Sequence, residues 1–237
     1  MTPENVKVLT FDIETASCWS SLSDRARAAA EASAAKRPDA QPGDAEERAA
    51  LSPLTGRIVA IGMRDLSSRT TQVCYEGSGL DGIANGVRYR PCDEAEALRR
   101  FWRIVDERAP SRFARIVTFH GRGFDVPFLL LRSALHGLTP TRDLLAPLHA
   151  GGDHVDLVDV LAPQRRDRPT LELACEVFGI ETPKGSMGGA DVGAAVREGR
   201  LLEVARYCAE DVRAEGELYE RLAPLLSIPR PQRRAFA

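Results

Sequence analysis

The sequence lacks the features that mark membrane, secreted and disulfide-bonded proteins. No apolar run approaches the roughly 20 residues that span a bilayer. The first residues, MTPENVKVLT, lack the basic and apolar regions of a signal peptide. The five cysteines are scattered and form no CxxC pair, which disfavours a disulfide framework and a cysteine zinc site. We therefore expect a cytoplasmic protein with no membrane association.

An excess of positive charge is also absent. The chain has 32 Lys and Arg against 34 Asp and Glu, a formal net charge of −2, and its only lysines are Lys7, Lys36 and Lys184. This balance argues against a histone-like or coating protein that holds nucleic acid through its overall charge. It leaves room for an enzyme that holds a polyanion through bound metal ions and a local basic groove.

The chain length and composition fit one α/β domain. The 237 residues, 43% of them hydrophobic, suffice to bury a core without disulfides or a structural metal ion. Apolar and β-branched runs predict strands over 6–13, 57–63, 70–75 and 115–119, and apolar residues at helical spacing predict long helices over 92–109, 125–136 and 201–226. Together they indicate a single domain over residues 1–237, with a mixed five-stranded sheet that has an antiparallel hairpin at its edge and helices on its flanks.

Residues 20–50 form an alanine- and charge-rich, low-complexity insertion within this domain. Eleven alanines lie between Ala26 and Ala50, among charged residues and without a large apolar side chain. The helix propensity of alanine predicts helix in the first half, but such a helix has little to bury. We expect a surface excursion, part helix and part mobile loop; a lid or a partner-binding surface is the alternative. The chain closes with a short basic tail, residues 228–237.

Carboxylates occur where exposure to solvent is not expected. Asp12 and Glu14 lie at the end of an apolar strand, in LTFDIETA, and residues two apart on a strand project from the same face. Adjacent like charges repel unless a cation lies between them, and hard oxygen ligands suit Mg²⁺ or Mn²⁺. Asp125, in HGRGFDVP, joins a predicted strand to a helix, where α/β folds place active sites. A helix-capping role for Asp125 is the alternative.

The last predicted helix contributes two further polar residues. Tyr207 and Asp211, in RYCAED, are four residues apart and therefore lie on one face of the helix. Taken alone, the pair is more typical of a surface tyrosine beside an exposed acid. The specific feature is the order of all the acidic segments along the chain, which is FDIET, then HGRGFD, then YCAED.

This order resembles the three motifs of DEDDy-type 3′–5′ exonucleases, and in particular the stand-alone relatives of the proofreading domain of family B DNA polymerases. The resemblance implies a ribonuclease H-like fold. It also implies that two divalent metal ions, Mg²⁺ or Mn²⁺, bind to four carboxylates, while Tyr207 orients or helps to deprotonate the attacking water. The implied metal ligands are Asp12, Glu14, Asp125 and Asp211, and with Tyr207 they are the expected catalytic residues.

One position departs from the motifs of these relatives, which usually have Asn where this chain has His120. A histidine can still donate a hydrogen bond, but its protonation varies near neutral pH. We expect the difference to affect the rate and the pH optimum. The residues expected to contact substrate are Ile13, Thr15, His120, Gly121, Phe124 and Lys184.

The expected activity is metal-dependent hydrolysis of phosphodiester bonds from the 3′ end of single-stranded DNA, which releases nucleoside 5′-monophosphates. Two alternatives stay open. One is a 3′–5′ exoribonuclease similar to RNase D, because no residue clearly reads a 2′-hydroxyl. The other is a catalytically weak nucleic-acid-binding module that retains the fold. Against this alternative, a site without catalytic activity has no need of several carboxylates that repel one another. The expected partner is single-stranded nucleic acid, with DNA preferred over RNA.

Overall fold

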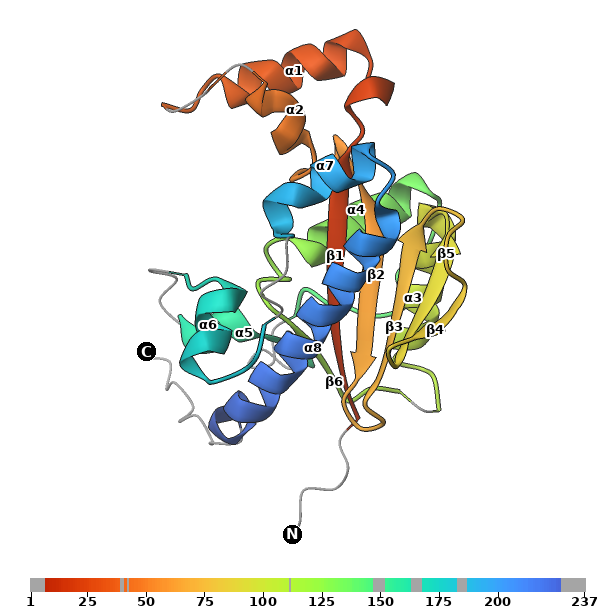
Figure 1. The fold of residues 1–237 in the computed structure, drawn as a ribbon, viewed down its shortest axis with the longest axis vertical. Coiled ribbons are helices and arrows are strands. Elements are labelled where there is room, and N and C mark those ends of the chain that lie inside the picture. Colours follow the sequence, from red (N-terminus) through yellow and green to blue (C-terminus); the bar gives the residue numbers. More distant parts are fainter. Residues whose placement is uncertain are drawn as a thin grey trace, which may run out of the picture.

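A seven-stranded mixed sheet runs through the centre of the protein, in the order β4-β5-β3-β2-β1-β6-β7 (Figure 1). The computed structural model describes residues 7–38, 41, 43–110, 112–146, 152–162, 168–182 and 187–226. The strands are β1 (Val8–Ser17), β2 (Gly56–Asp65), β3 (Thr70–Glu76), β4 (Gly82–Ala84), β5 (Val87–Cys92), β6 (Arg115–Thr118) and β7 (His154–Asp156). Strands β1, β2 and β3 are antiparallel neighbours, whereas β6 runs parallel to both β1 and β7.

The expected mixed α/β sheet is confirmed, but the expected number of five strands is wrong. Strands β4 and β7 have only three residues each, and β5 reads VRYRPC, so none of them carries the apolar pattern that identifies a strand. The placement of the β2–β3 hairpin at the sheet edge is also wrong. Strand β5 pairs in parallel with β3, and β4 lies outside β5, so the hairpin is internal.

Helices cover both faces of the sheet. Helix α8 (Leu201–Leu226) crosses the front of β1 and β2, while α3 (Glu94–Val105) and α4 (Asp125–Leu135) lie behind them (Figure 1). These are the three long helices that the periodicity predicts. The shorter helices are α5 (Leu157–Leu161), α6 (Leu171–Val177) and α7 (Val192–Arg197), with single 3₁₀ turns at Trp19–Ser21 and Gly189–Asp191. Within the described ranges, no helix is both long and apolar enough to cross a membrane.

The alternation of β1 decides which side chains meet which helices. Leu9, Phe11 and Ile13 are buried in one core with residues of α3 and α4. Thr10 lies on the other face, where its hydroxyl donates to the carbonyl oxygen of Val212 in α8 at 3.0 Å. Because successive side chains of a strand point to opposite faces, the even-numbered residues that follow Thr10 are turned towards α8.

The insertion folds as two helices that project beyond the end of the sheet, at the top of Figure 1. Helix α1 (Asp24–Ala34) confirms the helix predicted in the first half and has no buried residue. The second helix, α2 (Asp44–Ala49), was not expected, and Ala49 is its buried residue. The Thr15 hydroxyl donates to the Ala50 carbonyl at 2.7 Å, which ties the end of the insertion to β1. The basic tail, residues 228–237, lies outside the described residues.

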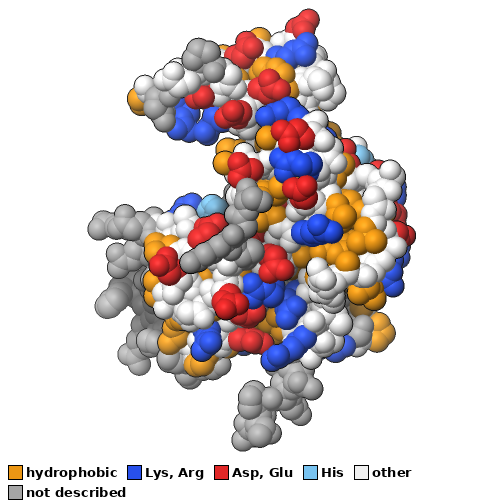
Figure 2. Space-filling model, viewed as in Figure 1, with side chains coloured by type: hydrophobic (Ala, Val, Ile, Leu, Met, Phe, Trp, Pro, Cys, Tyr) orange, Lys and Arg blue, Asp and Glu red, His pale blue; other side chains and the backbone are white. Residues whose placement is uncertain are grey.

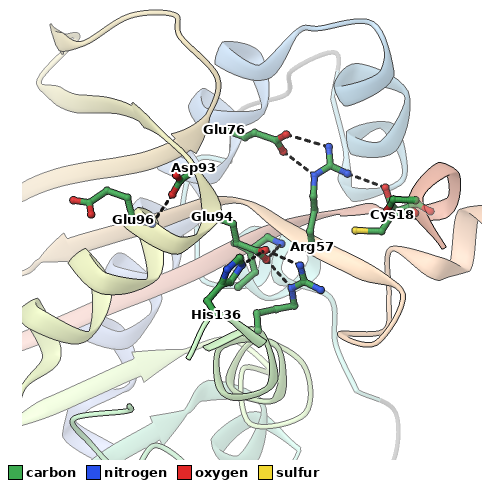
Figure 3. A network of polar contacts seen from close by, with 11 residues as sticks. Cys18, Arg57, Glu76, Asp93, Glu94, Glu96 and His136 are labelled. Atoms are coloured by element: carbon green, nitrogen blue, oxygen red, sulfur yellow. Dashed lines mark hydrogen bonds and ion pairs between the residues drawn. The ribbon is translucent and has the colours of Figure 1, made fainter. Parts of the chain in front are cut away.

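Glu94, the first residue of α3, links α3, β2 and α4 (Figure 3). Its carboxylate accepts two hydrogen bonds from Arg132, at 2.8 and 2.7 Å, and one from the backbone N–H of Ile58 at 2.8 Å. His136 lies 2.8 Å from the same carboxylate. Burial alone raises the pKa of Glu94, but hydrogen bonds from Arg132, His136 and Ile58 outweigh it, so the pKa is lowered from its ordinary value of 4.5.

We expect Glu94→Gln to reduce the free energy of unfolding at pH 7 by about 2 kcal/mol, because Arg132 loses its ionised partner in a site that is only 10–14% exposed. A carboxylate with a lowered folded pKa stabilises the protein fully above its unfolded pKa and loses this effect as pH falls through the folded value. The difference from wild type should therefore shrink towards pH 4 in urea denaturation. Glu96→Gln, which removes a more exposed carboxylate of the same helix, is the control. Equal effects of the two substitutions at pH 7 would contradict the linking role.

Candidate metal-dependent active site

Asp12 and Glu14 lie side by side on the face of β1 that α8 covers. The Cys208 thiol of α8 is 3.7 Å from the Asp12 carbonyl oxygen, and ligand atoms of Asp12, Glu14 and Cys208 all lie within 4.8 Å of one another. The β1–β2 register shifts between Glu14 and Thr15, so Glu14 is at an irregularity of the ladder. Such bulges redirect side chains beside functional sites. The expectation that the two carboxylates share a face is confirmed.

Asp125 comes to this pair from a different strand–helix junction. Strand β6 pairs with β1 only as far as Thr10 and Val117, so the two strands part before Ile13. Asp125, the first residue of α4, fills this gap, and its carboxylate accepts the backbone N–H of Ile13 at 3.1 Å. Its side chain is 3% exposed. The alternative role of Asp125 as a helix N-terminal acid is compatible with this position, but the bond to β1 brings its carboxylate to the acidic pair.

Helix α8 supplies the last members of the cluster. Tyr207 and Asp211 lie close enough to each other, and to the acidic pair, to interact electrostatically. The alternative of a surface tyrosine beside an exposed acid is wrong, because both residues are half-buried. The helix thus brings a phenol and a third acidic segment to residues nearly 200 positions away in the sequence.

Burial and mutual repulsion dominate the electrostatics of this cluster. Burial, followed by repulsion from Asp125 and Glu14, raises the pKa of Asp12 well above its ordinary value, and Glu14 is affected in the same direction. Burial is also the largest cause that raises the pKa values of Asp125 and Asp211 to about 7. None of the ion pairs within the described part of the chain includes these four carboxylates.

These observations fit a binding site for divalent cations. A set of carboxylate oxygens is the ligand type that Mg²⁺ and Mn²⁺ prefer, and no Lys or Arg of the described residues neutralises it by an ion pair. One further oxygen, Oε2 of Glu215, is buried in the described structure without a hydrogen-bond partner. A bound cation would offset both the burial and the repulsion of the like charges.

The turn between β6 and α4 is held by Asp156, at the end of β7. Its carboxylate accepts the backbone N–H groups of His120 at 2.9 Å and Arg122 at 3.0 Å, as well as that of Val158 at the start of α5. His120 has a φ of +64°, in the left-handed region that Asn adopts more readily than His. Its ring nitrogen Nε2 lies 3.3 Å from a guanidinium nitrogen of Arg168.

The residues expected to contact substrate have unequal surroundings. The side chain of Ile13 is 4% exposed and belongs to the core beneath α3 and α4. The hydroxyl of Thr15 donates its hydrogen bond to the Ala50 carbonyl oxygen. Phe124 is half-buried and packs on Phe128, with ring centroids 5.0 Å apart. Substrate contact by these residues stays a prediction.

The remaining two are a glycine and a lysine. A Cβ atom on Gly121 would lie 2.4 Å from the Thr118 hydroxyl, so close packing explains the glycine by itself. Lys184 lies outside the described residues. For both residues, too, substrate contact stays a prediction.

Sequence reasoning missed two acidic residues near the site. Asp156 caps α5 through the Val158 N–H, and it also holds the turn that leads to Asp125. Glu215 was not considered at all, although it follows Asp211 by four residues, as Asp211 follows Tyr207. The repeated spacing places Tyr207, Asp211 and Glu215 on one face of α8. It is the sequence pattern from which a role of Glu215 near the site could have been predicted.

Comparison with protein families decides the relationship of this chain. The sequence model of a family described as "Predicted 3'-5' exonuclease related to the exonuclease domain of PolB" matches residues 57–224, more than half of the chain. The chain belongs to this family. The match includes Asp125, Tyr207 and Asp211, while Asp12 and Glu14 precede it.

Individual relatives of this exonuclease-family chain are DNA polymerases. The chain is 30% identical over 150 residues to a DNA polymerase of Thermococcus aggregans, a match that covers 56% of this chain and 8% of the polymerase. It is 30% identical over 149 residues to a DNA polymerase of Pyrococcus glycovorans, with 56% and 18% covered. The chain thus matches less than a fifth of the length of either relative.

A solved structure shows the same fold. The family B DNA polymerase of Pyrobaculum calidifontis matches with a TM-score of 0.63 and 22% sequence identity, over 94% of this chain and 25% of the polymerase chain. The seven-stranded mixed sheet with its helices therefore has the fold of part of that polymerase, and the expected ribonuclease H-like α/β class agrees with it.

The buried cluster predicts how the stability of this exonuclease-family chain depends on pH. In EDTA, we expect Tm to fall by several degrees between about pH 5 and pH 8. Asp125 and Asp211 have folded pKa values of about 7 against an ordinary 3.8, so the folded state binds more protons than the unfolded state in this range and loses stability as pH rises. Asp125→Asn should flatten this dependence, whereas Asp81→Asn, at an exposed position, should not. A constant or rising wild-type Tm would refute the buried arrangement.

The backbone of His120 predicts a stability difference between two substitutions. We expect His120→Asn to change the free energy of unfolding by less than about 0.5 kcal/mol, because Asn tolerates a φ of +64°. His120→Val should cost about 1–2 kcal/mol, because a β-branched residue is strained there. Urea denaturation measures both. If the two variants were equally stable, the left-handed backbone at this position would be wrong.

Proposed function

We propose that this chain is a metal-dependent 3′–5′ exonuclease that hydrolyses single-stranded DNA and releases nucleoside 5′-monophosphates. The observation that carries the proposal is the cluster of four carboxylates from three distant segments, gathered between β1 and α8 without an ion pair to any described Lys or Arg. Membership in the family of predicted 3′–5′ exonucleases supports it independently. A non-catalytic binding module would gain nothing from burying mutually repelling charges.

In this proposal Asp12, Glu14, Asp125 and Asp211 hold two divalent ions, Mg²⁺ or Mn²⁺. Such a pair, when bound, promotes ionisation of the attacking water and stabilises the oxygen that leaves the phosphorus. The protein positions these ligands before substrate arrives: Asp125 accepts the backbone N–H of Ile13, and Asp211 lies beside Tyr207 on one face of α8. Preorganised charges of this kind need little rearrangement during the reaction.

Tyr207 acts in this scheme as an orienting residue. A phenol both donates and accepts hydrogen bonds, so Tyr207, which lies beside Asp211, can donate to that carboxylate and accept from a water. Burial, followed by repulsion of its phenolate by Asp211 and Glu14, raises the pKa of Tyr207, so in this arrangement it keeps its proton. Tyr207 therefore aligns a carboxylate and the attacking water.

Single-stranded DNA is the proposed substrate because the relatives named above are DNA polymerases. The visible surface carries acidic and basic side chains that are interspersed over α8 and the projecting insertion (Figure 2). With a net charge of −2, the protein has no overall attraction for DNA. The affinity in this proposal therefore comes from the bound ions and a few local contacts at the 3′ end. The cytoplasmic location stays a prediction.

The test uses 5′-labelled single-stranded DNA and RNA of one sequence, incubated with the protein in Mn²⁺, Mg²⁺ or EDTA and resolved on a sequencing gel. We expect a ladder that shortens from the 3′ end, faster on DNA and absent in EDTA. Asp12→Ala should reduce the rate by at least about 100-fold, and Tyr207→Phe by about 10- to 100-fold, because it removes the orienting hydroxyl.

Asp81→Asn, at an exposed position, is the matched control and should retain the wild-type rate. Faster degradation of RNA would change the substrate to RNA within the same mechanism. Binding of DNA that is equal in EDTA and Mn²⁺, without cleavage of either substrate, would replace the exonuclease with a binding module.

A further inference from the structure

Glu215 is a buried carboxylate for which the proposed four-carboxylate site has no use. It lies on α8, one helical turn beyond Asp211, and is 1% exposed. One of its oxygens, Oε1, accepts the backbone N–H of Phe119 at 3.1 Å. The other, Oε2, is buried without a hydrogen-bond partner in the described structure. No ion pair within the described part of the chain includes Glu215.

The single hydrogen bond does not explain why a carboxylate is present. A neutral side chain with a carbonyl oxygen could accept the Phe119 N–H without the several kcal/mol that a buried, unpaired charge costs. A second, unpartnered oxygen therefore indicates an interaction with something the protein binds. In native structures such orphaned polar atoms are few, and a bound ion or water is one of their ordinary explanations.

The neighbours of Glu215 indicate what that partner is. Glu215 is close enough to Asp12 to raise the pKa of that carboxyl, and its own pKa is raised by burial and then by Asp125 and Asp211. Its bonded partner, Phe119, immediately precedes the turn that leads from β6 to Asp125. Glu215 therefore joins the helix that carries Asp211 to the turn that carries Asp125, beside the cluster that fits divalent cations.

We propose that Glu215 is a fifth carboxylate of the metal centre, a positioning residue that fixes the β6–α4 turn through Oε1 and adds its charge and its free Oε2 to the surroundings of the bound ions. This inference rests on the proposed function, because it assumes that divalent ions bind at the cluster. Residues that hold or surround metal ligands in this way typically change metal affinity by about 10- to 100-fold when they are replaced.

The test measures Mn²⁺ binding by isothermal titration calorimetry, together with Tm in EDTA. Glu215→Gln keeps an oxygen for the Phe119 N–H but removes the charge. We expect it to weaken Mn²⁺ binding by about tenfold or more, while Tm in EDTA stays close to the wild-type value because the amide oxygen still accepts the Phe119 N–H. Glu215→Asp, which restores the charge on a shorter side chain, should bind Mn²⁺ more tightly than Glu215→Gln.

Glu220→Gln is the matched control, because it removes the same charge from an exposed position of α8 and should leave Mn²⁺ affinity unchanged. Mn²⁺ affinity of Glu215→Gln within twofold of this control would overturn the inference, whatever its Tm. The wild-type protein separates this result from failure of the proposed function. If it neither binds Mn²⁺ nor degrades DNA, the metal-dependent nuclease itself is wrong; if it does both and only Glu215→Gln fails to differ, the role of Glu215 alone is wrong.

Discussion

Repulsion among clustered carboxylates, two of them buried and two half-buried, is the constraint around which this protein is arranged. Asp12, Glu14, Asp125 and Asp211 come from three segments, and burial with mutual repulsion raises the pKa of each of the first two well above its ordinary value. Such a cluster destabilises the fold, so favourable contacts elsewhere or a bound ligand must offset it. On the opposite face of the strand, Leu9, Phe11 and other β1 residues pack in the hydrophobic core. This packing helps to offset the cost of the cluster and holds β1 in place.

The architecture positions the cluster by dividing the two faces of one strand. Leu9, Phe11 and Ile13 anchor β1 against α3 and α4, while Asp12 and Glu14 face α8. The parting of β1 and β6 after Thr10 leaves the N–H of Ile13 for Asp125. A gap between neighbouring strands thus becomes the place where a third segment joins the site, as is usual at strand ends in α/β folds.

Two further carboxylates, Asp156 and Glu215, support the turn that leads to Asp125. Asp156 fixes the turn before Asp125 through two backbone N–H groups, and Glu215 reaches the same turn from α8. Such supports set the orientation of the groups that act on a metal or a substrate. The insertion is different: α1 buries none of its residues, and Ala50 ties the end of the insertion to β1 at Thr15, the residue after Glu14.

The sequence by itself determined the α/β class, the three long helices, the shared face of Asp12 and Glu14 and the pairing of Tyr207 with Asp211, because each follows from local periodicity. It did not reveal β4, β5 and β7, which are too short or too polar to carry a pattern and exist through pairing with longer strands. The gathering of Asp125 with β1, and the approach of Glu215 to the same site, were decided only by the tertiary structure. Contacts between residues 96 or 112 positions apart leave no periodic trace in the sequence.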